Sequence, residues 1–398
     1  MSSNPYSSDA TTALCWKCKG SGVKLKRTKK TLHAIPCGVC VAASGSKAAA
    51  PLNDTTKPLP SRVLRRGFVR PFNPSQTWAP PGPAAAASID QAGALLADGE
   101  MVTALCGSWV IFQLVQGHRY TTDDLSTAAI AIQLYTTRGN LPRPQSHIDI
   151  GCGLGSVLSF VRWYFDDSLL KSVGIEAQLK HVELARKTIS INMKEPSLVS
   201  EVRHGDLREL ASNESGLLNA ETEFQSFDLV TGTPPYFPVP NGVVPTVQGR
   251  GYCSFEMRGG VETYCLAARQ CLRRTSDARF VFVQTAIEVK RSEEAIWSLA
   301  QMRILERVDF YGVDGKKDPL FVIFVCGWES VSKEQQESDG ETVPHDGSEK
   351  RVKDFAWDGV SREEYGVRRI TVRDKDGRYT REYHDLLVLV GKPPVLVA

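Results

Sequence analysis

The chain lacks any run of about 18 consecutive apolar residues, which is the length that a membrane-spanning helix requires. This absence excludes a membrane-spanning helix, and we expect no membrane partner. The chain also has little net charge, because 48 Lys and Arg residues stand against 45 Asp and Glu residues and leave +3 at pH 7. Such a balance does not by itself indicate a protein that binds nucleic acid.

The N-terminal residues give no indication of secretion. The stretch MSSNPYSSDATTAL has neither the charged start nor the apolar run of a secretory signal. We therefore expect a cytoplasmic protein whose ten cysteines are reduced thiols or metal ligands rather than disulfides. The basic run KLKRTKK at 24–30 suits contacts with a polyanion or a nuclear address, and a solvated tail has the same composition.

The composition divides the chain into three parts. Residues 10–45 hold four of the ten cysteines and few apolar residues. Residues 46–99 are rich in Ala, Pro, Gly and Ser, which favours a linker. From 100 to 398, strand-like and helix-like runs alternate, apart from an acidic stretch at 331–350 that we expect to be a disordered insertion in a surface loop.

Seven short runs rich in Val, Ile and Phe predict buried strands. They are HIDIG (147–151), SVGIEA (172–177), EVRHGD (201–206), FDLVTG (227–232), RFVFVQ (279–284), RVDFYG (307–312) and LFVIFVCG (320–327). Helical patterns such as QLKHVELARKTISINM lie between them. This alternation predicts an α/β domain with a mostly parallel sheet.

A glycine-rich turn follows the first of these strands. In HIDIGCGLGSVLSF, Gly151, Gly153 and Gly155 precede a helix, and glycines let the backbone turn sharply and approach a ligand. The spacing G-x-G-x-G is tighter than the G-x-G-x-x-G of dinucleotide-binding enzymes. With Asp149 before it, the turn resembles the first motif of class I S-adenosylmethionine-dependent methyltransferases.

Two further acids lie at the ends of the next two strands. Glu176 closes SVGIEA and Asp206 closes EVRHGD, and ligands gather at the carboxyl edge of such sheets. The resemblance implies that Glu176 accepts hydrogen bonds from the ribose hydroxyls of S-adenosyl-L-methionine. It also implies that Asp206, with the adjacent Leu207, lies at the adenine ring of this cofactor.

A stiff turn, TPPYFP (233–238), follows the fourth strand. It resembles the Asn/Asp-Pro-Pro-aromatic motif of methyltransferases that act on planar amino groups of adenine, cytosine or glutamine. By that resemblance, Thr233 and the Pro234 carbonyl orient the amine, Pro235 stiffens the turn, and Tyr236 stacks on the target. Thr233 departs from the motif, because one hydroxyl does not reproduce the geometry of a carboxamide.

The flanking segments narrow the resemblance. The stretch FQLVQGHRYTTDDLSTAAIA (112–131) is similar to the Q…GYRFSLDSLLLA segment of the bacterial transfer-RNA (adenine-37) exocyclic-amine methyltransferases. In those enzymes this segment closes over the cofactor. Tyr120 and Thr121 are therefore expected at the cofactor, although the Thr/Asp cluster also fits a simple N-capped core helix. The resemblance continues through 258–284 and the tail at 367–388.

The N-terminal cysteines form a separate pattern. Cys15, Cys18, Cys37 and Cys40 have the spacing C-x2-C-x18-C-x2-C, which predicts a structural zinc ribbon. CWKCKGSG also resembles a single CxxCxGxG knuckle of DnaJ-type chaperones. The basic run between the cysteine pairs suits phosphate contacts with RNA, and a protein-interaction ribbon is the alternative.

Together these features predict a Rossmann-like methyltransferase sheet of seven strands with helices on both faces, joined to a small zinc ribbon. The expected reaction is methylation of the exocyclic amine of adenine in RNA, with transfer RNA as the expected partner. Protein glutamine and DNA adenine are alternative substrates, and a catalytically weakened RNA-binding relative is another reading because of Thr233. An activating protein partner is not identified by the sequence.

Overall fold

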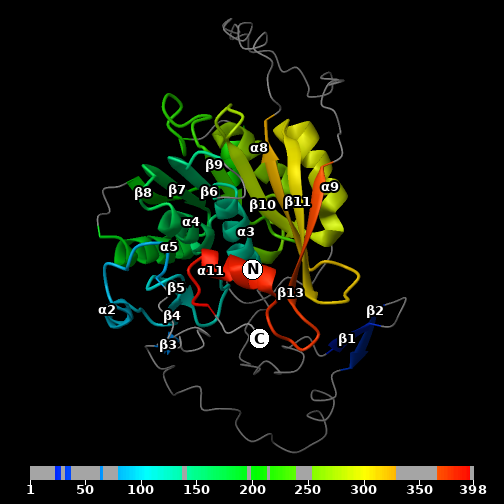
Figure 1. Ribbon diagram of the computed structural model, residues 1–398, viewed down its shortest axis with the longest axis horizontal. Helices are drawn as coiled ribbons and strands as arrows, with labels where there is room; N and C mark the ends of the chain where they lie inside the picture. Colours follow the sequence, from blue (N-terminus) through cyan, green and yellow to red (C-terminus); the bar gives the residue numbers. More distant parts are fainter. Residues whose placement is uncertain are drawn as a thin grey trace, which may run out of the picture. The chain divides into compact units, whose positions relative to one another are not determined.

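The computed structural model describes residues 79–136, 141–194, 199–212, 216–238, 253–328 and 365–394, and the backbone of three further strands. The chain divides into two compact units, Met1–Pro60 and Ser61–Ala398. In the first unit, β1 (Val23–Arg27) and β2 (Leu32–Pro36) form an antiparallel hairpin in which Val23 lies opposite Pro36. The second unit contains the large sheet shown in Figure 1.

This sheet has eight strands. In spatial order they are β13 (Gly366–Arg373), β11 (Arg303–Val313), β12 (Phe321–Gly327), β10 (Arg279–Thr285), β9 (Leu229–Gly232), β6 (Ser146–Ile150), β7 (Lys171–Glu176) and β8 (Val199–His204). Only β12 runs antiparallel to its neighbours, β10 and β11. The other strands are therefore oriented alike and present their carboxyl ends at one edge of the sheet.

The predicted Rossmann-like α/β sheet with helices on both faces is confirmed. Counted from β6 along the chain, the strands occur in the order 3-2-1-4-5-7-6, so the first five follow the doubly wound nucleotide-binding arrangement. All seven predicted strands are present, and β13 adds an eighth at the edge beside β11. This strand comes from the tail that follows the acidic stretch at 331–350, which lies outside the described residues.

Helices cover both faces of the sheet, and each face has its own core (Figure 1). One face carries α3 (Thr122–Gln133), α4 (Ser156–Tyr164), α5 (Leu179–Asn192) and α11 (Arg381–Leu389). The other carries α6 (Leu207–Ser212), α8 (Val261–Cys271), the turn η2 (Ala286–Glu288), α9 (Val289–Ala295) and the π-helical turn η3 (Ile296–Ala300). The strands between the two cores are buried on both sides, which explains their nearly continuous apolar sequences.

A small second sheet lies beside α5. It consists of β3 (Val63–Arg65), β4 (Glu100–Ala104) and β5 (Val110–Leu114) in that order. Asn192 of α5 accepts a hydrogen bond from the Val110 amide at 2.9 Å and donates one to the Val110 carbonyl at 2.7 Å.

The segment between β3 and β4 also packs on the domain, although it belongs to the range predicted as a linker. The short helix α2 (Ile89–Ala94) has a capping box at Ser88, and Trp163 donates its indole N–H to the Pro83 carbonyl at 3.0 Å. The amide of Ala86 donates to the carbonyl of Asn192 at 2.9 Å. Its small Ala and Gly residues let this segment lie close to the buried Trp163 ring, since an added Cβ at Gly82 would come within 2.4 Å of it.

Candidate active site

A cavity opens at the carboxyl ends of β6, β7, β8 and β9. Its lining comes from residues 118–124, the glycine turn, the ends of β7 and β8, the proline turn, and residues 253–264. The lining residues are His118, Tyr120, Asp124, Gly151, Cys152, Gly153, Leu154, Ser156, Ile175, Glu176, Ala177, Gln178, Gly205, Asp206, Leu207, Thr233, Pro235, Cys253, Arg258, Gly259 and Tyr264. The structure thus brings the predicted glycine turn and the predicted proline turn to one cavity.

The glycine turn uses the conformational freedom of its three glycines. Gly151, Gly153 and Gly155 have φ values of +69°, +55° and +77°, which L-residues with a side chain rarely adopt. A Cβ at Gly153 would meet nothing within 4 Å, so this backbone borders open space in the cavity. Gly155 serves a different purpose, because a Cβ there would lie 3.2 Å from Ala185 of α5.

Asp149 lies behind the cavity and is not part of its lining. Its carboxylate accepts hydrogen bonds from the Thr231 hydroxyl at 2.8 Å and the Leu158 amide at 3.1 Å. It therefore joins β6 to β9 and to the first turns of α4. Burial raises the pKa of Asp149 to about 7, and the hydrogen bonds from Thr231 and Leu158 limit the rise.

Glu176 lines the cavity at the end of β7, as its predicted role requires. Its two oxygens accept hydrogen bonds from the Gly153 amide at 2.9 Å and the Gln178 amide at 2.6 Å. The carboxylate thereby fixes the glycine turn against β7. Burial raises the pKa of Glu176, whereas these two amides act to lower it.

Asp206 and Leu207 line the cavity at the end of β8. Arg208 donates to both oxygens of Asp206, at 3.0 and 2.8 Å, and these hydrogen bonds lower the pKa of that carboxyl. Arg258 approaches the same carboxylate at 3.8 Å and donates to the Ala177 carbonyl at 3.2 Å. Asp206 is therefore an anion held between two guanidinium groups at the cavity wall.

The proline turn reaches the cavity through Thr233 and Pro235, whereas Pro234 is buried and not part of the lining. The Tyr236 ring packs against the core, and its hydroxyl donates to Asp123 of α3 at 2.5 Å. Burial raises the pKa of Tyr236 well above its usual value. Phe237 is the more exposed ring of the turn, with 46% of its surface accessible.

The segment predicted to close over the cofactor lies at this cavity. The Tyr120 side chain lines it, and its hydroxyl donates to the Ala104 carbonyl at 3.3 Å. Thr121 is exposed and lies outside the lining. Its backbone N–H donates to Asp124 at 2.8 Å in a capping box, so Thr121 is the N-cap of α3, which fits the alternative interpretation of an N-capped helix.

Asp124, Arg258 and Tyr264 are among the lining residues that the sequence did not predict as part of the site. Asp124 lies in the segment 112–131 and Arg258 begins the segment 258–284. The sequence analysis included both segments but did not assign these two residues to the site. Tyr264 lies in the helix after the proline turn, and a Cβ at Gly151 would come within 2.1 Å of its hydroxyl. The glycine at this first position therefore also makes room for the Tyr264 ring.

The predicted zinc ligands Cys15, Cys18, Cys37 and Cys40 lie outside the described residues. Within the described part of the chain, no group of three or more His, Cys, Asp or Glu side chains is arranged to hold a metal ion. No helix in that part is both long and apolar enough to cross a bilayer.

No protein-family model matches the chain, and no curated protein matches it. Solved structures similar to it include a predicted O-methyltransferase from Agrobacterium tumefaciens, with 14% identity, a TM-score of 0.37, and coverage of 69% of this chain and 100% of that one. A type I restriction-modification methyltransferase subunit from Streptococcus thermophilus has 13% identity, a TM-score of 0.37, and coverage of 54% and 45%. The methyltransferase domain of bacterial CtHen1 has 11% identity, a TM-score of 0.34, and coverage of 51% and 97%. These TM-scores lie below 0.5, and the strand order of this chain defines its fold.

Proposed function

We propose that the chain is an S-adenosylmethionine-dependent methyltransferase that acts on the exocyclic amine of adenine in RNA, with transfer RNA as the expected substrate. The observation that carries this proposal is the shared cavity. Gly153 and Glu176 of the donor motifs and Thr233 of the acceptor motif line the same space. Methyl transfer requires a donor and an acceptor to meet at one point, and this arrangement supplies both halves of a site.

The donor half fits S-adenosylmethionine, which supplies an activated methyl group on sulfur when bound. Glu176 and Asp206 present carboxylates at the ends of neighbouring strands, and such groups accept hydrogen bonds from ribose hydroxyls and an adenine amine. The open space beside Gly153 lets a ligand approach the backbone closely.

The acceptor half fits a planar amine. Thr233 offers a hydroxyl at the cavity, and the prolines give the turn a fixed shape that preserves this placement. Phe237 adds an exposed ring on which a flipped base can stack, supported by Phe255 at a ring distance of 5.7 Å. The choice of RNA adenine over other amines rests on the resemblance of the flanking segments and on the basic N-terminal run.

The cysteine module is proposed as a zinc ribbon that docks RNA. In the β1–β2 hairpin, Val23 lies opposite Pro36, so the chain enters and leaves the hairpin at the same end. The two CxxC pairs adjoin these two ends in sequence, which supports a shared tetrahedral site. Strand β1 contains Lys24, Lys26 and Arg27, cations of the type that contact phosphates.

The test is methyl transfer from labelled S-adenosylmethionine to RNA, DNA and protein in separate reactions, with digestion and mass spectrometry of each product. The proposal expects label in N6-methyladenosine from RNA. Label confined to glutamine in protein, or to adenine in DNA, would show that the proposed substrate is wrong and that the proposed methyl transfer to a planar amine is right. Binding of the donor without any labelled product would favour a catalytically weakened relative.

A further inference from the structure

The proline turn presents an incomplete acceptor to an amine. The motif that it resembles carries Asn or Asp at the position of Thr233, whose hydroxyl provides neither a carboxamide nor a charge. An amine that gains a methyl group must also lose a proton. A second acceptor in the same cavity would supply what Thr233 lacks.

Asp124 is a carboxylate in the required place. It lines the cavity together with Thr233 and Pro235, and it is 7% exposed. Thr121 engages its Oδ2 atom through the backbone N–H at 2.8 Å. Within the described part of the chain, no hydrogen-bond partner engages Oδ1. One oxygen is therefore fixed, while the other stays available to a ligand.

Asp123, the residue before Asp124, connects the start of α3 to the proline turn. Asp123 accepts a hydrogen bond from the Tyr236 hydroxyl at 2.5 Å, although the two residues are 113 positions apart. The start of α3 is thereby held against the segment that carries Thr233. Asp124 is consequently positioned relative to the acceptor half of the site and not merely near it.

Helix capping alone does not require an ionisable group at this position. Asp124 is the N3 residue of the capping box, and a neutral Gln there would also accept the Thr121 N–H, whereas burying an ionised carboxylate is unfavourable. Asp123 and Asp149 add negative charge nearby, and Tyr236 and Cys253 also face Asp124. Burial first, and then the charge of Asp123, raises the pKa of Asp124 well above its usual value, which makes its ionised form a stronger proton acceptor.

We propose that Asp124 is a further catalytic residue of this site, whose carboxylate orients the target amine and accepts its proton during methyl transfer. The proposal rests on the proposed function. In the step, the amine nitrogen forms a bond to the methyl carbon while the methyl–sulfur bond breaks and its electron pair stays on sulfur. The amine proton passes to Asp124, which leaves a neutral methylated base and a thioether.

The test compares the wild type with Asp124→Asn in three measurements. They are the affinity for S-adenosylhomocysteine by calorimetry, kcat with the RNA that the wild type methylates as substrate, and the pH profile of this kcat. An Asn at 124 retains an oxygen that accepts the Thr121 N–H, so the cap is preserved. We expect an unchanged affinity and a kcat lower by roughly 10²–10³-fold. The rise of kcat with pH that reflects ionisation of Asp124 should disappear.

Two further variants make the result specific. Asp124→Asn combined with Thr233→Asn should recover at least about tenfold in kcat, because the family's amide then orients the amine. Asp167→Asn, whose side chain is 71% exposed, is the matched control and should behave as the wild type. Both comparisons use the full chain.

Three outcomes would overturn the inference. An unchanged kcat in Asp124→Asn would show that the carboxylate takes no part in the reaction. A loss of S-adenosylhomocysteine affinity that accounts for the loss of rate would make Asp124 a donor-binding residue. If the wild type binds S-adenosylhomocysteine but methylates no RNA, the proposed function fails first and the inference fails with it.

Discussion

The carboxyl of Asp149 makes the stability of the fold depend on pH. It is 2% exposed, and burial raises its pKa from the usual 3.8 to about 7. Between about pH 4 and pH 7, the folded state therefore binds more protons at this site than the unfolded state. The contribution of Asp149 to stability is present at low pH and is lost as the pH rises towards 7.

Replacing Asp149 by Asn should remove this dependence. The amide can still accept from the Leu158 N–H and pair with the Thr231 hydroxyl, so the contacts between β6, β9 and α4 persist. In urea unfolding from pH 4.5 to 7.5, we expect the wild type to lose a few kcal/mol, on the order of 1.4 kcal/mol per unit of pKa shift, relative to the variant. Parallel stability curves for the two proteins would contradict the buried titration.

Gly232 controls the space that Tyr264 occupies. A Cβ at this position, the last residue of β9, would lie 2.8 Å from the Tyr264 ring, which is itself buried. We expect Gly232→Ala to lower the free energy of unfolding by about 1–3 kcal/mol, because the ring must shift. Gly366→Ala in β13 meets nothing within 4 Å and is the control. Equal unfolding midpoints for the two variants would rule out the close contact.

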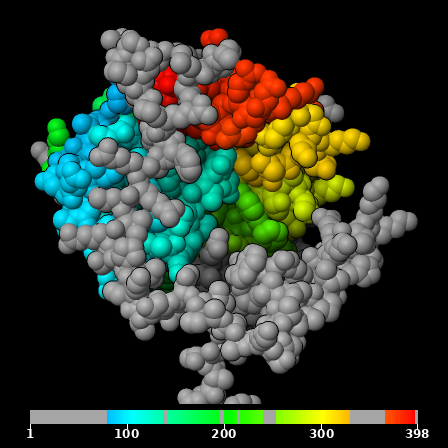
Figure 2. All heavy atoms as spheres, turned by 90° about the horizontal axis from the view of Figure 1, so that it is seen from below, coloured from blue at the N-terminus to red at the C-terminus, as the bar shows by residue number. Residues whose placement is uncertain are grey.

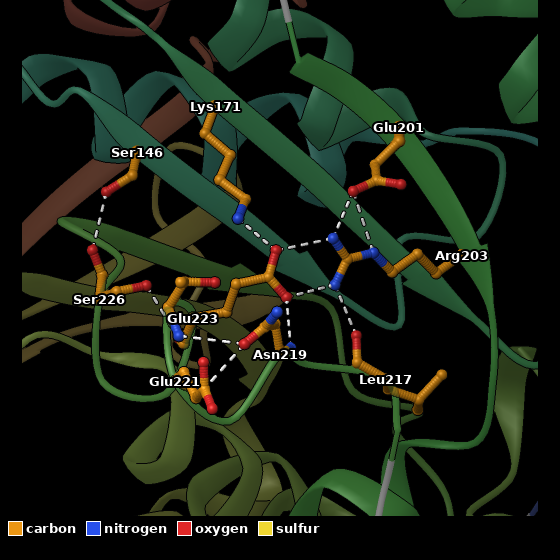
Figure 3. Close-up of polar contacts among 10 residues, drawn as sticks. Ser146, Lys171, Glu201, Arg203, Leu217, Asn219, Glu221, Glu223 and Ser226 are labelled. Carbon is orange, nitrogen blue, oxygen red and sulfur yellow. Dashed lines mark hydrogen bonds and ion pairs between the residues drawn. The ribbon is translucent and has the colours of Figure 1, made fainter.

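At the scale of the elements, an ion-pair network joins β7, β8 and the segment before β9 (Figure 3). Glu223 is 4% exposed and forms ion pairs with Lys171 of β7 and Arg203 of β8, the latter at 2.7 Å. It also accepts the Asn219 amide at 2.7 Å, which closes the loop on itself. Despite the opposing effect of burial, these partners lower the pKa of Glu223 to about 2.

Removing the negative charge of Glu223 should destabilise the fold only at pH values at which this carboxyl is ionised. The folded pKa lies below the unfolded one, so the stabilisation is complete above about pH 5 and is lost as the pH falls towards 2. Glu223→Gln should cost about 3 kcal/mol at pH 7, with a smaller difference at pH 3, in chemical unfolding. Glu221→Gln, at an exposed neighbouring residue, is the control. If Glu223→Gln lowered the free energy of unfolding equally at pH 3 and pH 7, the ionised Glu223 would not be the source of the stabilisation.

The elements themselves could be predicted from the sequence because each signal is local. Runs such as RFVFVQ are apolar since both of their faces are covered, and all seven predicted strands are found. The RRITVR segment of β13 is strand-like in sequence but was not counted among the seven strands of the sheet, because its alternating pattern is that of an edge strand with one exposed side. Its partner β11 lies more than 50 residues earlier in the chain, so local composition does not reveal the pairing.

The site was predictable to the extent that its residues follow strand ends. Gly151, Gly153, Glu176 and Asp206 are found at the expected edge for this reason. The roles of side chains at a distance were not predictable. Asp149 faces α4 rather than the cavity, and Tyr236 is engaged by Asp123, because both depend on how helices dock against the sheet.

At the scale of the whole second unit, the C-terminal segment packs on the sheet and contacts the cavity lining through Lys392. Strand β13 pairs with β11, and α11 packs against α3, as the red residues beside the teal and yellow ones in Figure 2 show. Beyond α11, Lys392 donates to the Leu105 carbonyl and to the Tyr120 hydroxyl, the latter at 3.2 Å. A residue near the end of the chain thus holds a ring that lines the cavity.

We expect Lys392→Met to weaken binding of S-adenosylhomocysteine by roughly 3–10-fold, because Tyr120 loses a charged hydrogen-bond partner worth about 1 kcal/mol. Calorimetry of the full chain measures the effect directly. Lys375→Met is the control, since that side chain is 78% exposed in the loop after β13. Equal affinities in the two variants would show that the C-terminal segment does not position Tyr120.

The central claim is that the cavity at the carboxyl edge holds the methyl donor, and the most direct measurement is a titration of the full chain with S-adenosylhomocysteine. We predict saturable binding of one equivalent, which Glu176→Ala weakens by at least about tenfold through loss of the ribose acceptor. The exposed Glu183→Ala on α5 should leave it unchanged. Absence of binding to the wild type, or equal binding to both variants, would contradict the account.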